Sequence, residues 1–321
     1  MIDFRYHLVS IVAVFLALTV GIVVGTTTLN GGIVETLRVS SDKVIRDKRA
    51  LEAEVKDLRT AVTRRDEFAT AVGDQVIAGQ LSGRRVLLVA TPDAPAEVVN
   101  GLSRRVAAAG GTPGGVLRLR NDFLDPAKNQ VIDDVVVNVV PPGVTLPNGT
   151  PSDRAAVELA AALLQLPGSP ALSSDAAARV LGGFMGADLV AFEPPAGADP
   201  AVAAPPASLA ILVTGGSDGK PLDDAGRLRQ RAVLTLARAL DLRSAGVVVA
   251  GPATAAEPAG LLAAVRDDRS LSDRVSSVDT ADTAYGELVV VLALREQAAG
   301  RSGRYGQGPG SQAAVPGSTS P

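Results

Sequence analysis

An uncharged run near the amino end constrains this chain more than any other feature. Residues 8–25 read LVSIVAVFLALTVGIVVG, and only Ser10 and Thr19 among them are polar. A helix rises about 1.5 Å per residue, so about 20 apolar residues cross the hydrocarbon core of a bilayer. A helix also pairs its own backbone groups, as lipid requires. We therefore predict a membrane anchor over residues 8–29, preceded by a short tail over residues 1–7.

Two other interpretations of this run stay open, a cleaved signal peptide and a buried core helix. A signal peptide has an apolar region of about 7–15 residues followed by an A-x-A-like site. The run is longer than that and no such Ala pair follows it, which favours an uncleaved anchor. Arg5 stands on one side of the run, and Arg38, Lys43 and Arg46 stand on the other. The positive-inside rule therefore slightly disfavours a cytoplasmic amino end.

Residues 33–78 have the pattern of a coiled coil. They contain no Pro, one Gly, and nine basic against nine acidic residues. Apolar residues repeat every seven positions in two series, and β-branched residues at a with Leu at d favour a parallel dimer. The prediction is a dimeric stalk on the order of 70 Å long. A single helix lying on its own domain is the alternative, although its apolar period would drift toward 3.6. The predicted interface residues are Val34, Leu37, Val44, Leu51, Val55, Leu58, Val62, Ala69 and Val72.

The remainder, residues 84–299, alternates short apolar runs with helical patterns. Such alternation is typical of an α/β domain with a parallel sheet, and we expect a Rossmann-like arrangement. Residues 131–140 fit a strand or a helix. Ser152 is expected to cap one helix, and Ser173 or Ser174 another. The predicted strands are 84–91, 115–119, 209–216, 246–251 and 275–279, and the predicted helices are 94–109, 152–165, 173–183, 222–241, 257–268 and 282–299.

Two segments lack a regular pattern. Residues 193–208 contain five Pro and are predicted to form a loop. Residues 300–321 are rich in Gly, Ser, Pro and Gln, and we predict that this tail is disordered.

Composition excludes several kinds of catalytic site. The chain has no Cys, and its one His is His7, so cysteine nucleophiles, thiolate metal sites and catalytic triads built on His are absent from the α/β domain. The net charge of −3 shows no excess of basic residues of the kind that binds nucleic acid. Soft copper ligands are limited to Met1, Met185 and His7, so we expect no high-affinity copper site within one chain. We predict no enzymatic activity and no catalytic, cofactor-binding or metal-ligating residues.

The segment VTGGSDGK, residues 213–220, stands between a strand and a helix, where phosphates are bound in many α/β proteins. A P-loop needs G-x-x-x-x-G-K-[ST]. Here Gly215 and Gly219 are one residue too close, and Pro221 replaces the Ser or Thr. We therefore interpret the segment as a flexible turn. No G-x-G-x-x-G fingerprint follows the first strand either.

Asp279 and Asp282 follow the last strand, and they are the candidate ligand residues at the edge of the sheet. Two carboxylates at that edge would hold Mg²⁺ or polarise a ligand. The alternative is that Asp282 or Thr280 caps the last helix, and that interpretation is favoured. Asp223 and Asp224 are expected to complement the dipole of the helix they begin.

The opening MIDFRYHLVSIVAVFLALTVGIVVGTT resembles the start of the actinobacterial family named after mycobacterial copper transport protein B. Residues 278–283 (VDTADT) and 303–306 (GRYG) are similar to segments of the same family. The resemblance covers most of residues 1–306, more loosely over 120–210. It implies a cell-envelope protein, an outer-membrane location among the alternatives, and a domain outside the cytoplasm. The family offers no catalytic or metal-ligating motif that transfers to positions of this chain.

The resemblance implies two different functions. One member type is a channel for copper export and tolerance; a corynebacterial member acts in daughter-cell separation with a second membrane protein. A single spanning helix forms a pore only by oligomerising. Our leading hypothesis is copper export or homeostasis, with copper as a ligand implied by resemblance only. The alternative is a non-enzymatic dimeric scaffold that regulates peptidoglycan hydrolysis with a cell-division partner. The least favoured hypothesis is a carboxylate- or nucleotide-dependent enzyme.

Overall fold

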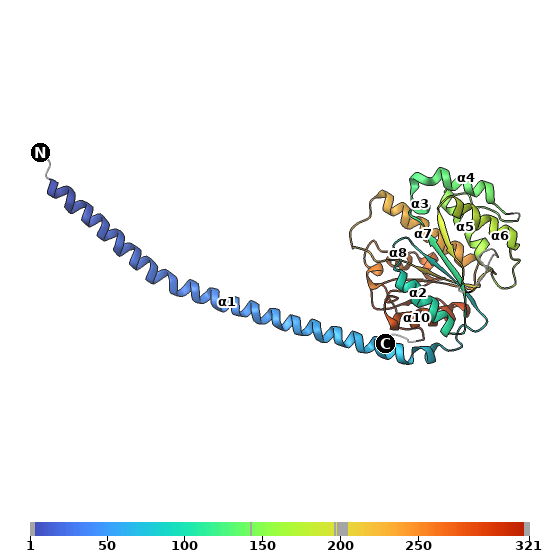
Figure 1. Ribbon diagram of the computed structural model, residues 1–321, viewed down its shortest axis with the longest axis horizontal. Helices are drawn as coiled ribbons and strands as arrows, with labels where there is room; N and C mark the ends of the chain where they lie inside the picture. Colours follow the sequence, from blue (N-terminus) through green and yellow to red (C-terminus); the bar gives the residue numbers. More distant parts are fainter. Residues whose placement is uncertain (1–3, 142, 196, 198–204, 318–321) are drawn as a thin grey trace. The chain divides into compact units, whose positions relative to one another are not determined.

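A computed structural model describes residues 4–141, 143–195, 197 and 205–317, and within the first helix it describes the side chains of residues 6–26 and 39–77. The chain divides into two units, residues 1–64 and 65–321. Helix α1, Phe4–Ile77, contributes residues to both units (Figure 1). Residues 1–3, much of the predicted loop 193–208 and the last four residues lie outside the described part. So do the side chains of Val34 and Leu37, two of the residues predicted for the dimer interface.

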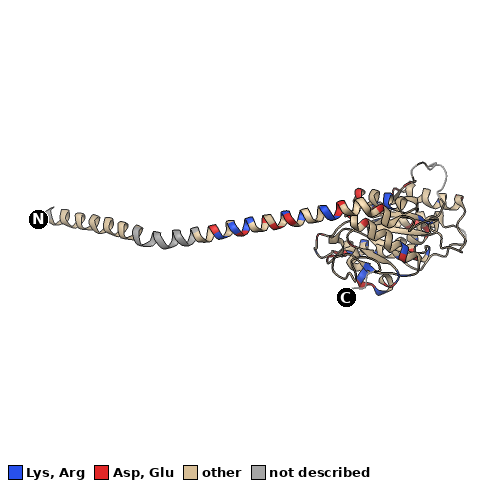
Figure 2. Ribbon diagram, turned by 90° about the horizontal axis from the view of Figure 1, so that it is seen from below, with Lys and Arg blue, Asp and Glu red and all other residues tan. Residues whose placement is uncertain are grey.

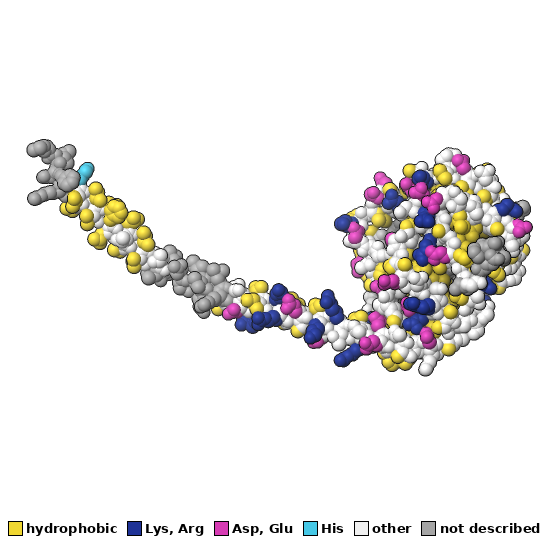
Figure 3. All heavy atoms as spheres, in the orientation of Figure 1, with side chains coloured by type: hydrophobic (Ala, Val, Ile, Leu, Met, Phe, Trp, Pro, Cys, Tyr) yellow, Lys and Arg dark blue, Asp and Glu magenta, His cyan; other side chains and the backbone are white. Residues whose placement is uncertain are grey.

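The first unit is a continuous helical segment. Its portion Tyr6–Thr26 is long and apolar enough to cross a membrane, with a mean hydropathy of 2.8. Figure 3 shows apolar side chains along the surface of this portion, and none of it is buried. Residues 39–64 carry interspersed basic and acidic side chains (Figure 2). The structure therefore contains the apolar helix that the sequence predicts.

The second unit is built on a seven-stranded sheet of order β3-β2-β1-β4-β5-β6-β7. All neighbouring strands are parallel except β2 and β3. This confirms a mostly parallel α/β sheet. The strands are β1 Arg85–Ala90, β2 Thr112–Leu119, β3 Val190–Glu193, β4 Leu209–Val213, β5 Val247–Ala250, β6 Ser276–Val278 and β7 Arg304–Tyr305.

Helices cover both faces of the sheet (Figure 1). Side chains of β1 alternate between them, with Leu87 and Val89 in one core cluster and Val86 and Leu88 in the other. The first face is covered by α3 to α9, and the second by α2, α10 and the end of α1. The helices are α2 Ala96–Ala108, α3 Asn121–Leu124, η1 Pro126–Lys128, α4 Asn129–Val139, α5 Pro151–Leu163, α6 Ser174–Gly186, α7 Asp224–Leu242, η2 Ala253–Ala256, α8 Leu261–Asp267, α9 Arg269–Ser272 and α10 Ala284–Ala298.

The last turns of α1 belong to the core of the second unit. Ile77 is fully buried, and Gly73 lies so close to Leu288 of α10 that an added Cβ would be 2.9 Å from its Cδ2. Arg65 lies over the ring of Tyr285, 5.4 Å from its centroid. Residues 65–77 are thus part of this domain, which extends beyond the predicted bounds of 84–299.

Helix boundaries depend on local caps, and some differ from the predictions. Residues 131–140 fall in helix α4 and its C-cap. Thr150, rather than Ser152, caps α5, because Thr150 and Asp153 form a reciprocal capping box with Pro151 at the first helical position. Ser173 caps α6, as one of the two alternatives predicted. The predicted helix 257–268 is shorter, because Ala259 has a φ of +68° and α8 begins only at Leu261.

Candidate functional site

The carboxyl ends of β1 and β4 meet at a pocket of about 570 Å³. The chain adds strands in one direction from β1 to β3 and then in the opposite direction from β4 to β7, so β1 and β4 flank the point where the strand order reverses. In open parallel sheets, this is where ligands bind. The pocket is lined by Thr91, Pro92, Asp93, Asn121, Leu124, Thr214, Gly215, Gly216, Ser217, Asp218, Leu222, Gly226, Arg229, Gln230, Val233, Ala259, Gly260 and Leu261.

The loop after β1 places a carboxylate at the mouth of the pocket. The Thr91 hydroxyl donates to Asp93 Oδ1 at 2.6 Å, and its backbone N–H donates to the carbonyl of Val213 at 3.0 Å. Gly215 lies against this loop, because an added Cβ would be 2.4 Å from the carbonyl oxygen of Asp93. Glycine is therefore required here by the close approach of two loops.

Side chains of the loop after β4 bind two of the amides of the same loop. Ser217 Oγ accepts from the N–H of Gly219 at 3.1 Å, and Asp218 accepts from the N–H of Lys220 at 3.0 Å. Asp223 caps α7 by accepting from the N–H of Gly226 at 2.6 Å. Residues 214–218 line the pocket. Close packing explains the glycines at 215 and 216, whereas Gly219 has a positive φ of +74°.

The far wall of the pocket comes from α7 and the start of α8. Gln230 donates its side-chain amide to the carbonyl of Ala259 at 3.0 Å. Ala259 has a positive φ, a conformation that non-glycine residues adopt at a cost of about 1–3 kcal/mol. Gln230 therefore stabilises a strained residue at the rim of the pocket.

Sequence reasoning missed Thr91, Asp93, Arg229 and Gln230. A signal for the first two was present, because Thr91-Pro92-Asp93 directly follows a buried strand, and carboxyl ends of parallel strands form ligand sites. Arg229 and Gln230 carry no such signal, because their place at the pocket depends on how α7 packs.

The two predicted carboxylates of the β6 edge do not form an open site. Asp279 is fully buried, and it accepts from the N–H groups of Gln307 at 2.8 Å and Gly308 at 2.9 Å. Asp282 is exposed, and partial desolvation followed by the nearby charges of Asp66 and Asp279 raises its pKa. The favoured capping interpretation is also wrong, because Thr283 caps α10 by accepting from the N–H of Gly286.

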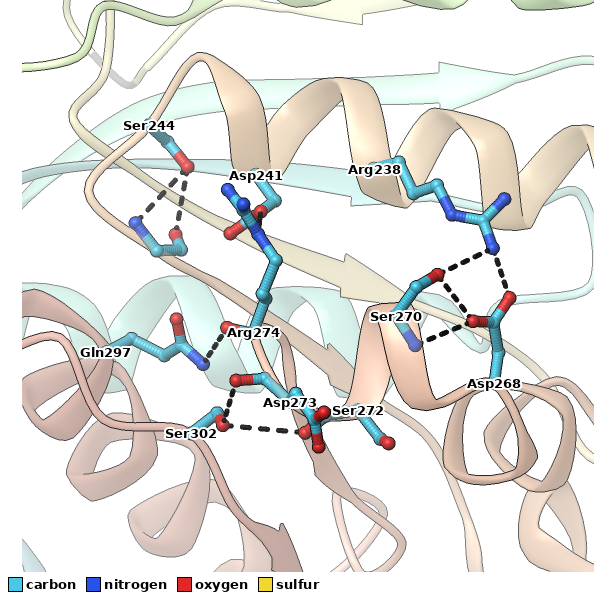
Figure 4. A network of polar contacts seen from close by, with 11 residues as sticks. Arg238, Asp241, Ser244, Asp268, Ser270, Ser272, Asp273, Arg274, Gln297 and Ser302 are labelled. Atoms are coloured by element: carbon cyan, nitrogen blue, oxygen red, sulfur yellow. Dashed lines mark hydrogen bonds and ion pairs between the residues drawn. The ribbon is translucent and has the colours of Figure 1, made fainter.

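A polar network lies at the opposite end of β5 and β6, where α7, α9 and α10 meet (Figure 4). Arg274 pairs with Asp241 at 2.6 Å, and Gln297 donates to the carbonyl of Arg274 at 2.9 Å. Asp268 binds Arg238 and Ser270, and the hydrogen bond from Ser270 is the main cause of its lowered pKa. These side chains pair with one another and with the backbone, so we interpret the network as a structural link between α7, α9 and α10.

One buried carboxylate has no partner. Glu158 of α5 is fully buried, and neither of its carboxylate oxygens accepts a hydrogen bond within the described part of the chain. Desolvation raises its pKa to about 7, against a smaller opposing effect of Arg154. This residue has no visible role in the pocket.

Most described residues of the predicted dimer seam are exposed in the single chain. Val44, Leu51 and Leu58 are exposed, as are Val55 and Val62. Ala69 is different, because it is 5 % exposed and belongs to the core cluster under α2 and α10. Its assignment to a dimer seam is therefore wrong, and Val72 in the same turns is half-buried.

Across the described residues, no three His, Cys, Asp or Glu side chains come together as a metal site would require.

Comparison with known proteins relates the whole chain to one family. The family model described as copper transport outer membrane protein, MctB, matches residues 1–316. The chain is 28 % identical over 316 residues to the copper transporter MctB of Mycobacterium tuberculosis, which covers 97 % of this chain and 98 % of the relative. The proteins of the same name from Mycobacterium bovis and Mycobacterium leprae are 28 % and 27 % identical over the same shares. Because the match takes in nearly the entire sequence, the chain belongs to the MctB family.

Proposed function

We propose that this protein serves copper transport in the cell envelope, attached to a membrane by one helix and presenting its α/β domain on a paired stalk. The observation that carries the proposal is the family match over residues 1–316, together with the name of the relatives, copper transporter MctB. The α/β sheet is proposed to be Rossmann-like, which fits its strand order.

Membrane attachment rests on Tyr6–Thr26. An exposed helix of this hydropathy is stable in lipid, where its side chains need no other cover. In water the same surface would be an apolar patch far larger than a monomer normally exposes. We place residues 65–321 outside the cytoplasm, as the family description of an outer membrane protein suggests.

Copper is the cargo in this proposal. Cu(I) prefers thiolate and thioether ligands, and the chain holds no Cys and two Met. Met185 is exposed on α6. We therefore propose that transport depends on assembly of this chain with itself or with a further membrane protein, and that no high-affinity copper site lies within one chain.

Pairing along the stalk is proposed from the exposed seam. Leu51 and Leu58 are 61 % and 60 % exposed and stand one heptad apart. A second copy of the same helix would bury them, because a and d side chains of parallel helices pack into one another.

The test uses a mycobacterial strain that lacks its own family member. The strain would express this chain, or a variant with Leu16→Asp and Leu18→Asp in the apolar segment, at equal levels. Cell-associated copper would be measured by mass spectrometry after exposure to copper. We expect the intact chain to lower cellular copper and the anchor variant to have no effect. Unchanged cellular copper in cells that contain the intact chain in their membrane would contradict the proposal. Daughter cells that stay unseparated without the intact chain and separate with it would favour the scaffold hypothesis.

A further inference from the structure

We infer that the pocket between β1 and β4 binds an uncharged small molecule that carries neighbouring hydroxyl groups, such as a sugar, a polyol or a nucleoside. The inference is independent of copper transport, since it concerns a site on the α/β domain that the family description does not mention. It rests on four observations about the lining residues.

The first observation is an available carboxylate oxygen. Thr91 occupies Asp93 Oδ1, whereas Asp93 Oδ2 accepts no hydrogen bond from the described residues and lies beside Gly215. A carboxylate only accepts hydrogen bonds, so it needs donors such as ligand hydroxyls. Parallel α/β proteins bind the hydroxyl of a ribose through a carboxylate in this way.

The second observation is a hydroxyl at the pocket. Thr214 lines the pocket, and only 4 % of this residue is exposed. Its γ-methyl group lies next to Gly251, where an added Cβ would be 2.8 Å away. Its hydroxyl has no hydrogen-bond partner among the residues that the structure describes, and its oxygen is not one of the fully enclosed unpaired atoms, so a molecule in the pocket can reach it. A ligand hydroxyl would supply that partner.

The third observation is the presence of donors beside these acceptors. The side chains of Asn121 and Arg229 line the same pocket and form no hydrogen bond or ion pair within the described part of the chain. Gln230 uses its amide N–H on Ala259, which leaves its carbonyl oxygen as an acceptor. A hydroxyl both donates and accepts, so adjacent hydroxyls match a lining of mixed groups.

The fourth observation is that the charges of the lining do not favour an anion, because the carboxylates of Asp93 and Asp218 stand against one guanidinium, that of Arg229. Asp93 and Asp218 both line the pocket, and only Asp218 is neutralised, by Lys220 at 2.8 Å. The N–H groups of Gly219, Lys220 and Gly226 are already bound by side chains of their own loop. A phosphate would therefore meet the carboxylate of Asp93, and these three amides would not be free to hold it. The volume of about 570 Å³ suits a ligand of nucleoside or disaccharide size.

The experiment measures binding to the full chain in detergent by saturation-transfer difference NMR. The probes are myo-inositol against cyclohexanol, and adenosine against 2′,3′-dideoxyadenosine, with inorganic phosphate as an anionic competitor. We expect myo-inositol or adenosine to bind and the probes without neighbouring hydroxyls not to bind. Binding of myo-inositol points to a sugar or polyol, and binding of adenosine alone points to a nucleoside. Failure of both, equal binding of the dideoxy probe, or displacement by phosphate would overturn the inference.

Variants locate the binding. Asp93→Asn should weaken it about tenfold, because a hydrogen bond to a charged group is lost. Thr214→Val keeps the size of the side chain and should also weaken binding. Asp224→Asn is the matched control, since Asp224 stands on α7 outside the pocket lining and should leave binding unchanged. Circular dichroism checks folding, and unchanged binding by a folded Asp93→Asn or Thr214→Val chain would contradict the assignment.

Discussion

Arg266 and Asp279 form an ion pair of 2.8 Å in which the two side chains are 3 % and 0 % exposed. The pair also holds the carboxyl-terminal segment. Arg266 donates to the carbonyls of Pro309 at 2.6 Å and Tyr305 at 3.0 Å. Asp279 accepts from the N–H groups of Gln307 and Gly308. The two charges therefore join β6 and α8 to residues that composition alone marks as disordered.

Asp279→Asn should destabilise the α/β domain strongly. The substitution leaves the Arg266 charge buried without a counter-ion, which costs about 3–5 kcal/mol in comparable pairs. Urea unfolding followed by circular dichroism would measure the change. The matched control is Asp224→Asn, because the pair of Asp224 with Arg227 is exposed and should contribute about 1 kcal/mol or less. Equal effects of the two substitutions would show that the buried pair is not a main support of the segment.

Ending the chain after Ser302 should lower the unfolding temperature on the order of 10 °C, since several kcal/mol are lost from a domain of this size. The truncation removes β7 and Tyr305, which is 4 % exposed and donates its hydroxyl to Glu296. Burial, followed by Glu296, raises the pKa of that phenol, so it stays a donor. A chain ending after Gly317 is the control. An unchanged unfolding temperature in the shorter chain would restore the prediction of a disordered tail.

Glu158→Gln should remove a pH dependence of stability. Burial raises the folded pKa of Glu158 from 4.5 to about 7, so the folded state binds the proton more tightly than the unfolded chain. The contribution of Glu158 to the free energy of unfolding is fully present below pH 4.5. It is lost as the pH rises through 7, by roughly 3 kcal/mol at most. Urea unfolding of both chains between pH 4.5 and 8 would show this fall in the parent only. Parallel pH profiles would mean that Glu158 is not buried in solution.

Leu51→Asn with Leu58→Asn should dissociate the stalk pair. Two amides would replace apolar d contacts at the seam, and a buried amide without a partner is unfavourable. Sedimentation of the full chain in detergent would report the mass. The control is Ala53→Asn with Thr60→Asn, which places the same amides one heptad apart on the outer face of the helix. The coiled-coil proposal fails if both double variants sediment as the parent does.

The sequence was sufficient where a pattern is local. The uncharged run alone predicts the apolar helix, because its length and hydropathy match a bilayer. The strands β1, β4 and β5 are continuous apolar runs, since both of their faces are buried. Ser173, one of two predicted alternatives, caps α6 through its own side chain, and Asp223 stands at the start of α7 as predicted.

Only the tertiary structure decided features that join distant residues. The short strand β3 was missed, because its pairing with β2 depends on a partner some 70 positions earlier in the chain. The tail could not be recognised as ordered, since its amides and carbonyls bind Arg266 of α8 and Asp279 after β6, which composition does not connect to it. Ala69 keeps the seven-residue period and yet packs inside its own domain.

The pocket also combines features that local sequence determines with features that the tertiary structure decides. The sequence determined that Thr91-Pro92-Asp93 and the segment 213–220 each follow a strand. The strand order then brought the two loops together, and the packing of α7 added Arg229 and Gln230. Local sequence specifies where each strand ends and which polar residues follow it. The sheet brings these residues together, because β1 and β4 are neighbours in space although more than 100 residues separate them in the chain.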